Sequence, residues 1–176
     1  RSKQKCARNR PRCILGVKQV VSEKPQKVAV LMGGRSSERK ISIKTGKQIS
    51  QALRGEGYEV KEIDPAGALV KDLKDFQPDV VFIALHGKYG EDGTIQGLLE
   101  LLGFPYTGSG VLSSALCMDK VIAKKVMSYE DIPTPSFQVI TEQLEQGTGE
   151  RLIKDFGLPL VVKPARQGSA IGVSIV

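Results

Sequence analysis

The chain has 176 residues, of which 40% are hydrophobic and 5% aromatic, with no tryptophan. This is enough to fill one aliphatic core, or to make one domain and part of a second. The net charge of +7 is unevenly placed: residues 1–27 carry nine basic side chains and one acid, whereas the remainder carries 17 basic and 18 acidic residues. The globular part therefore has no bulk attraction for nucleic acid.

The first 26 residues form a basic leader that we expect to be disordered. A foreign or upstream-encoded tail is the favoured interpretation, ahead of a transit peptide and, last, an RNA-binding arm. The missing initial methionine suggests a fragment or a processed product. No segment is long enough to span a membrane. Cys6, Cys13 and Cys117 lack metal-ligand spacing, which fits a reduced, cytoplasmic location.

Strands and helices alternate in the first part of the chain. In chain order we predict a strand at 27–32, a helix at 37–54, a strand at 58–63, a helix at 68–76, a strand at 79–85 and a helix at 94–102. This order favours an open, mostly parallel, Rossmann-like α/β sheet. The first helix is expected to bury Ile41, Ile49, Ala52 and Leu53.

Two glycine-rich turns follow the first and third predicted strands, after Met32 and after Leu85. In an open parallel sheet, ligands bind at the carboxyl ends of the strands. Both turns fall at such ends, so we expect a binding site there.

The segments after the turn at 107–110 lead into a second unit. The pattern predicts helical segments at 112–129, a strand at 136–140, a helix at 142–156 and a hairpin at 160–176. We therefore expect an N-terminal domain at 27–119 and the start of a central α+β domain at 120–176. The sequence stops after the second hairpin strand, so this domain is expected to be incomplete.

The hairpin carries chemistry suited to a polyphosphate. Lys163 stands at a strand end and supplies a compact positive charge. Gly168 and Gly172 let backbone N–H groups approach an anion, and Pro164 ends the hydrogen bonding of the strand. Taken alone, the stretch is more typical of an ordinary hairpin whose tip is only a turn.

Glu38 and His86 are the candidate residues at the two turns. Glu38 lies near a helix N-terminus, where it can act as a first-turn capping acid or receive a substrate ammonium. His86 is the only histidine, at the end of a buried strand. A structural, hydrogen-bonded histidine and a ligand contact are both compatible with that position.

Asp119 and Lys120 open the helix that starts the second unit. Asp119 is a plausible N-cap, whereas Lys120 is a cation that the helix dipole disfavours, so phosphate would serve as its partner. A solvated lysine is the alternative. Glu91 and Asp92 are interpreted as caps and turn formers.

Four motifs in this order and spacing resemble the D-alanine–D-alanine ligases of the ATP-grasp superfamily: GGRSSER, HGKYGEDGTIQGLLELLGFPYTGSG, SALCMDK and VVKPARQGSAIGVS. The resemblance covers about 27–176. It implies the N-terminal domain and an incomplete ATP-grasp domain of a three-domain enzyme. Cys117, where alanine is common, and Ala170, where serine often follows Ser169, depart from the family pattern.

The resemblance implies a reaction in which ATP phosphorylates one D-alanine, whose acyl phosphate is attacked by the amine of a second, for peptidoglycan precursors. Glu38 and Ser169 would be the catalytic candidates; Glu38 and His86 would bind the first D-alanine. The ATP phosphates would be bound by Lys120, Lys163, Gly168 and Ser169. These roles suit phosphoryl transfer, which needs charge neutralisation and positioning.

The family's Mg²⁺ ligands would lie beyond Val176, so we expect no metal site in this chain and no turnover by it alone. The full-length enzyme is expected to be a homodimer that uses ATP and D-alanine and binds neither nucleic acid nor membrane. Two alternatives stay open: a noncatalytic nucleotide-binding or dimer-forming module, and a fragment of a ligase that joins D-lactate or D-serine.

Overall fold

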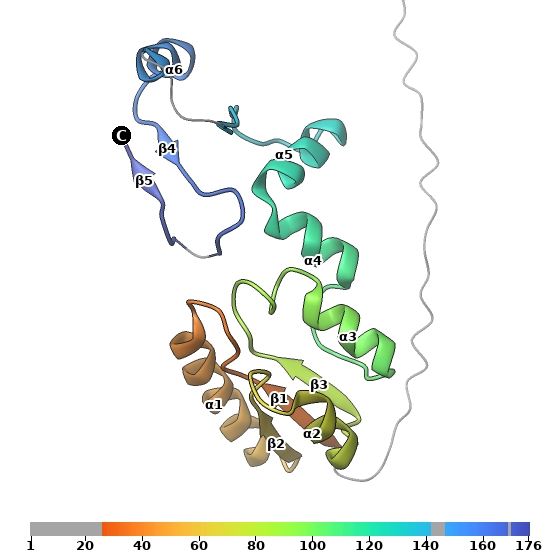
Figure 1. Ribbon diagram of the computed structural model, residues 1–176. Coiled ribbons are helices and arrows are strands. Elements are labelled where there is room, and N and C mark those ends of the chain that lie inside the picture. The colour runs from red at the N-terminus through yellow and green to blue at the C-terminus, as the bar shows by residue number, and fades with distance from the viewer. Residues whose placement is uncertain (1–25, 142–146, 169) are drawn as a thin grey trace, which may run out of the picture.

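The computed structural model describes residues 26–141, 147–168 and 170–176. The leader, apart from Gln26, therefore lies outside the described residues. The first part of the chain is a three-layer α/β unit with a parallel sheet in its middle (Figure 1). The predicted fold class is confirmed.

The sheet has the strand order β2-β1-β3, and both pairings are parallel. Its strands are β1 (Lys27–Leu31), β2 (Glu59–Ile63) and β3 (Val80–Ile83). Tyr106 adds a parallel bridge to Val81 at the outer edge of β3. The chain passes from β1 to β2 on one side of β1 and then crosses to β3 on the other side. The direction of strand order therefore reverses between β1 and β3.

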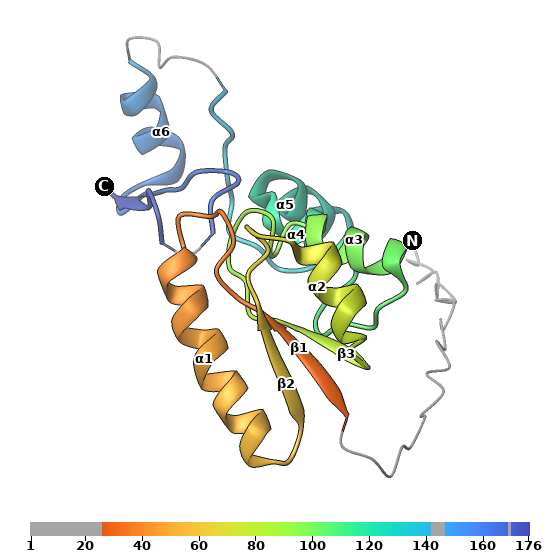
Figure 2. The ribbon, with the colours of Figure 1, turned by 60° about the horizontal axis from the view of Figure 1, so that its bottom comes forward.

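Side chains of β1 alternate between two apolar layers, which explains its continuous apolar sequence. Ala29 and Leu31 join a core with α2 (Leu69–Phe76) and α3 (Thr94–Leu102). Val28 and Val30 face the opposite layer, which α1 (Arg39–Gly55) covers with Ile49 and Leu53. Figure 2 shows α1 on one face of the sheet and α2 with α3 on the other.

The buried side of α1 differs from the predicted one. Ile41 is 55% exposed and Ala52 is also exposed, whereas Ser42, Gly46 and Ser50 are buried. A Cβ at Gly46 would overlap the Met32 side chain. The helix lies so close to the sheet that only small residues fit along this line, which hydrophobic periodicity does not reveal.

Two helices follow the sheet, α4 (Val111–Met118) and α5 (Lys120–Tyr129). Asp119 caps α5 as predicted, because its Oδ1 accepts hydrogen bonds from the N–H groups of Val121 and Ile122. The predicted helical segments at 112–129 are thus confirmed.

The last part of the chain contains α6 (Thr148–Phe156) and an antiparallel hairpin of β4 (Val161–Val162) and β5 (Ser174–Ile175). The hairpin prediction is confirmed, with shorter strands. The strand predicted at 136–140 is wrong, because these residues pair with no strand among the described residues. The start of the helix predicted at 142–156 lies outside the described residues. Among the described helices, none combines the length and apolarity that a membrane span requires.

Candidate functional site

The carboxyl ends of β1 and β3 lie side by side where the strand order reverses, and a pocket of about 340 Å³ opens there. Its lining includes Gly33 and Gly34 after β1 and His86 after β3. Ligands of open α/β sheets bind at such a point. Residues of the two predicted glycine-rich turns therefore line this pocket.

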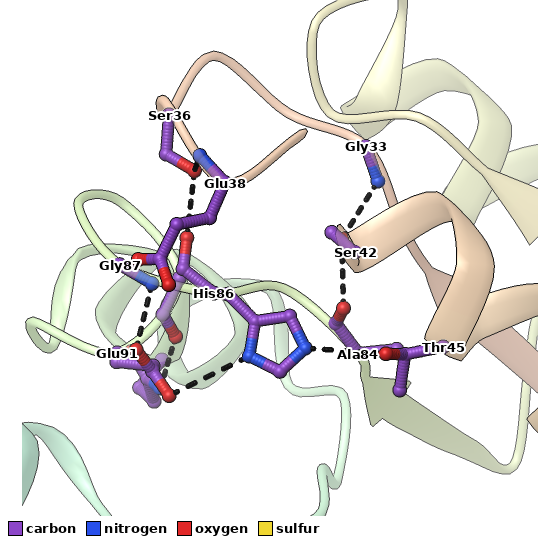
Figure 3. A network of polar contacts seen from close by, with 11 residues as sticks. Gly33, Ser36, Glu38, Ser42, Thr45, Ala84, His86, Gly87 and Glu91 are labelled. Carbon is purple, nitrogen blue, oxygen red and sulfur yellow. Dashed lines mark hydrogen bonds and ion pairs between the residues drawn. The ribbon is translucent and has the colours of Figure 1, made fainter. Parts of the chain in front are cut away.

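The turn after β1 is fixed to the end of β3 by one buried serine. The N–H of Gly33 donates to Oγ of Ser42 over 2.9 Å, and that hydroxyl donates to the carbonyl of Ala84 over 2.7 Å (Figure 3). Ser42 therefore ties the two strand ends together from the first turn of α1.

A second clamp holds the turn from the side of β2. Asp64 accepts a hydrogen bond from the Gly34 N–H over 2.9 Å and pairs with Arg39 at 2.6 Å. Arg39 also donates to the Gly34 carbonyl over 2.8 Å. The hydrogen bond from Arg39, with those from Gly34 and Ala66, lowers the pKa of Asp64 to about 2 although burial opposes this.

Glu38 stands immediately before α1 with only 8% of its surface exposed. Its N–H donates to Oγ of Ser36, whereas its carboxylate extends toward Gly87 (Figure 3). A Cβ at Gly87 would overlap Oε2 of Glu38, and one at Gly168 would lie 2.9 Å from it. Among the described residues, none donates a hydrogen bond to this carboxylate.

His86 follows β3 and lies between two polar partners (Figure 3). Its Nε2 is 3.4 Å from Oγ1 of Thr45, and its Nδ1 is 3.9 Å from Oε1 of Glu91. The other oxygen of Glu91 accepts the Gly87 N–H over 2.6 Å. Glu91 thus fixes the backbone beside His86, which agrees with its predicted structural role.

Asp92 is a turn former, as predicted. Its carboxylate accepts hydrogen bonds from the N–H groups of Tyr89 and Thr94. Burial alone would raise the pKa of Asp92, but the hydrogen bonds from Tyr89 and Thr94 outweigh it and lower the pKa.

Lys120 lies against the loop after β4, far away in sequence. Its N–H donates to the Ala165 carbonyl over 2.9 Å, and its Nζ donates to the Gln167 carbonyl over 2.5 Å. Next to it, Arg166 pairs with Asp119 at 2.8 Å. Lys120 and the glycine-containing loop, both predicted to bind phosphate, therefore lie in contact.

The remaining predicted site residues sit at the ends of the same loop. Lys163 follows β4 and is exposed, and among the described residues no acceptor pairs with its ammonium. Gly168 lies beside Glu38, at the other end of the segment that contacts Lys120. Ser169 lies outside the described residues.

Four further residues shape the site without having been predicted: Ser42, Asp64, Arg39 and Arg166. Asp64 directly follows the second predicted strand, so the rule that ligands and turns gather at carboxyl ends could have found it. Ser42, Arg39 and Arg166 carry no comparable signal, because their partners lie elsewhere in the sequence.

The described residues contain no group of three or more His, Cys, Asp or Glu side chains that could hold a metal ion. We assign no step to a metal below.

Comparison with known proteins gives consistent matches. The family model described as D-ala D-ala ligase N-terminus matches residues 66–109, and that described as D-ala D-ala ligase C-terminus matches 126–176. A D-alanine–D-alanine ligase of Pelotomaculum thermopropionicum is 54% identical over 155 residues, covering 85% of this chain and 49% of the relative.

Solved structures agree. The D-alanine–D-alanine ligase of Bacillus anthracis is similar with a TM-score of 0.72 and 46% identity, over 86% of this chain and 49% of that one. The same enzyme complexed with ATP gives a TM-score of 0.68 and 44% identity, over 86% and 50%. The chain spans about half the length of the curated relatives it matches. By sequence and by fold, it belongs to the D-alanine–D-alanine ligase family.

Proposed function

We propose that the protein containing this chain is an ATP-dependent ligase that joins two D-alanines. The observation that carries the proposal is Glu38: the residue as a whole is only 8% exposed, and its carboxylate receives no hydrogen bond from the described residues. A buried charge is costly unless it is paired. A substrate ammonium is the partner that this position would accept.

The surroundings of Glu38 suit a small amino acid. Gly87 and Gly168 approach the carboxylate with backbone only, so space beside it is limited. Glu38 would bind the ammonium of the first D-alanine, and His86 would line the same site. Thr45 and Glu91 lie on either side of the His86 ring and would keep its orientation.

Nucleotide binding is assigned to the loop after β4 and the start of α5. Lys120 and Lys163 would neutralise phosphate charge, and Gly168 and Ser169 would lie over the phosphates. The ATP complex of the Bacillus anthracis relative supports ATP as the nucleotide. Lys120 already lies on the loop, so a bound phosphate would compete with the Gln167 carbonyl for its ammonium.

The reaction would take place between the amino-acid site at Glu38 and the phosphate site at Lys120 and Lys163. A carboxylate oxygen of the first D-alanine would form a bond to the γ-phosphorus of ATP, and ADP would leave. The amine of the second D-alanine would then attack the acyl carbon, lose a proton and expel phosphate. Such chemistry depends on charge neutralisation and alignment, which Glu38, Lys120 and Lys163 would supply.

Several finer assignments belong to the same proposal. We place the domain boundary at 119/120, between α4 and α5, and expect the enzyme to act as a homodimer in the cytoplasm. The dipeptide product would serve as a peptidoglycan precursor.

The proposal is tested with the complete product of the gene that encodes this sequence. The purified protein is incubated with ATP and D-alanine, and phosphate and dipeptide are measured together. We expect one D-alanyl-D-alanine per ADP formed. ATP cleavage independent of D-alanine, or ATP binding without dipeptide, would contradict the proposal and favour a noncatalytic nucleotide-binding module.

The second substrate is tested in the same assay. D-Lactate or D-serine is offered together with limiting D-alanine, and the products are separated by mass. A preference for the mixed product would assign the protein to the alternative ligase class.

A further inference from the structure

One short segment, Ala165–Gly168, touches both parts of the proposed site. At its start, the Ala165 and Gln167 carbonyls accept hydrogen bonds from the backbone N–H and the Nζ of Lys120. At its end, Gly168 lies beside the Glu38 carboxylate. The segment therefore connects the proposed phosphate-binding lysine to the proposed ammonium-binding acid.

Gly168 packs closely against residues of the proposed D-alanine site. A Cβ there would lie 2.9 Å from Oε2 of Glu38, 3.5 Å from the Cα of Gly87 and 3.7 Å from Oε2 of Glu91. Movement of the segment toward Glu38 would therefore displace the Glu38 side chain, because packed atoms resist closer approach.

Between the two ends, an ion pair fixes the segment to α5. Nε of Arg166 lies 2.8 Å from Oδ2 of Asp119, whose Oδ1 accepts the N–H groups of Val121 and Ile122. The Asp119 side chain is 17% exposed and that of Arg166 is 82% exposed. Exposed pairs of this kind contribute little to stability. The Arg166–Asp119 pair holds the segment against the N-terminal end of α5, which carries Lys120.

We infer that Arg166 and Asp119 are positioning residues that couple the two substrate sites. Their ion pair keeps Ala165–Gly168 in the place where phosphate binding at Lys120 and D-alanine binding at Glu38 favour each other. The inference rests on the proposed function and adds to it the residues that link ATP to D-alanine. Neither residue need touch a substrate.

The test is a double-mutant cycle in the complete gene product with Arg166→Gln, Asp119→Asn and both together. Asn is a good N-cap, so the capping of α5 is retained. The measured quantity is the ratio of the dissociation constants of a non-hydrolysable ATP analogue without and with saturating D-alanine. Calorimetry supplies both constants, and thermal melting reports stability.

We expect each single variant to reduce this ratio by about fivefold or more, the low end of typical coupling between sites. The double variant should lose no more than one single variant, because both changes break the same contact. Arg166→Lys should restore part of the ratio. Arg151→Gln, an exposed arginine on α6, is the control and should leave it unchanged.

An unchanged ratio in a folded Arg166→Gln protein would overturn the inference and leave the proposed function standing. Losses that add up in the double variant, or that follow the melting temperature, would also overturn it. A wild-type protein that forms no dipeptide would defeat the proposed function, and the inference with it.

Discussion

The Glu38 carboxylate is the single group on which the proposed chemistry depends most. Its position before α1 was readable from the sequence, but its burial against Gly87 and Gly168 was not, because that requires three segments to meet. A capping acid and a substrate-binding acid have the same sequence signature. The observed geometry favours the second, since the side chain makes no capping hydrogen bond.

Glu38→Gln keeps the shape of the side chain and removes its charge. We expect the KM for the first D-alanine to rise about 10- to 100-fold, as for loss of a charge-assisted hydrogen bond, while the KM for ATP stays the same. Steady-state kinetics of the complete gene product checks this. Glu56→Gln, at the exposed C-terminal end of α1, is the matched control. Unaltered D-alanine kinetics would remove Glu38 from the site.

Lys163→Ala removes the exposed cation after β4. The KM for ATP should rise about tenfold or more, as for a lost contact to a charged group, with little change for D-alanine. Lys154→Ala on α6 removes a similar exposed charge and should have no effect. If only the affinity for D-alanine changed, the phosphate role of Lys163 would be wrong.

Among the elements, α1 has the strictest packing requirement. Its buried line of Ser42, Gly46 and Ser50 allows close approach to the sheet, and Ser42 uses that approach to fix Gly33 and Ala84. The sequence predicted the helix but not this line, because hydrophobic patterns mark apolar faces and not small buried ones.

Gly46→Ala should destabilise the fold by about 1–3 kcal/mol, since its Cβ would overlap Met32 and overpacking costs that much. Gly55→Ala in the same helix meets no atom within 4 Å and should be neutral or stabilising by about 0.5–1 kcal/mol. Chemical denaturation of the two variants gives the comparison. Equal effects would contradict the close packing of α1 on the sheet.

The Arg39–Asp64 clamp gives the turn after β1 a defined pH dependence. The pKa of Asp64 is about 2 in the folded chain, against 3.8 for an ordinary aspartate. Its contribution to stability is therefore complete above pH 3.8 and is lost as the pH falls toward 2. Arg39 stays charged throughout this range.

Asp64→Asn should lower the Tm at pH 7, and the difference from wild type should shrink as the pH falls from about 4 to 2. Melting curves across this range test the claim. Asp75→Asn, on the exposed side of α2, serves as the control. A difference that persists unchanged at low pH would exclude the ion pair as the cause.

At the scale of the whole molecule, the alternation of strands and helices was enough to predict the parallel sheet and the two turns that border the pocket. The sequence-based prediction failed where the structure depends on contacts between residues that are far apart in the sequence. Residues 136–140 have a strand-like sequence, but a strand needs a neighbour, and none of the described residues supplies one. Lys120 and the glycine-containing loop were predicted to bind the same phosphates, but neither the contact of Lys120 with Gln167 nor the Arg166–Asp119 pair was predicted.

In the proposed enzyme, D-alanine binds at Glu38 while the nucleotide binds at Lys120 and the loop after β4. A crystal structure of the complete gene product with D-alanine and a non-hydrolysable ATP analogue tests this most directly. We predict the D-alanine ammonium within about 3 Å of a Glu38 oxygen, and phosphate oxygens equally near Nζ of Lys120 and Lys163. An ammonium bound elsewhere, with the Glu38 carboxylate still unpaired, would contradict the account.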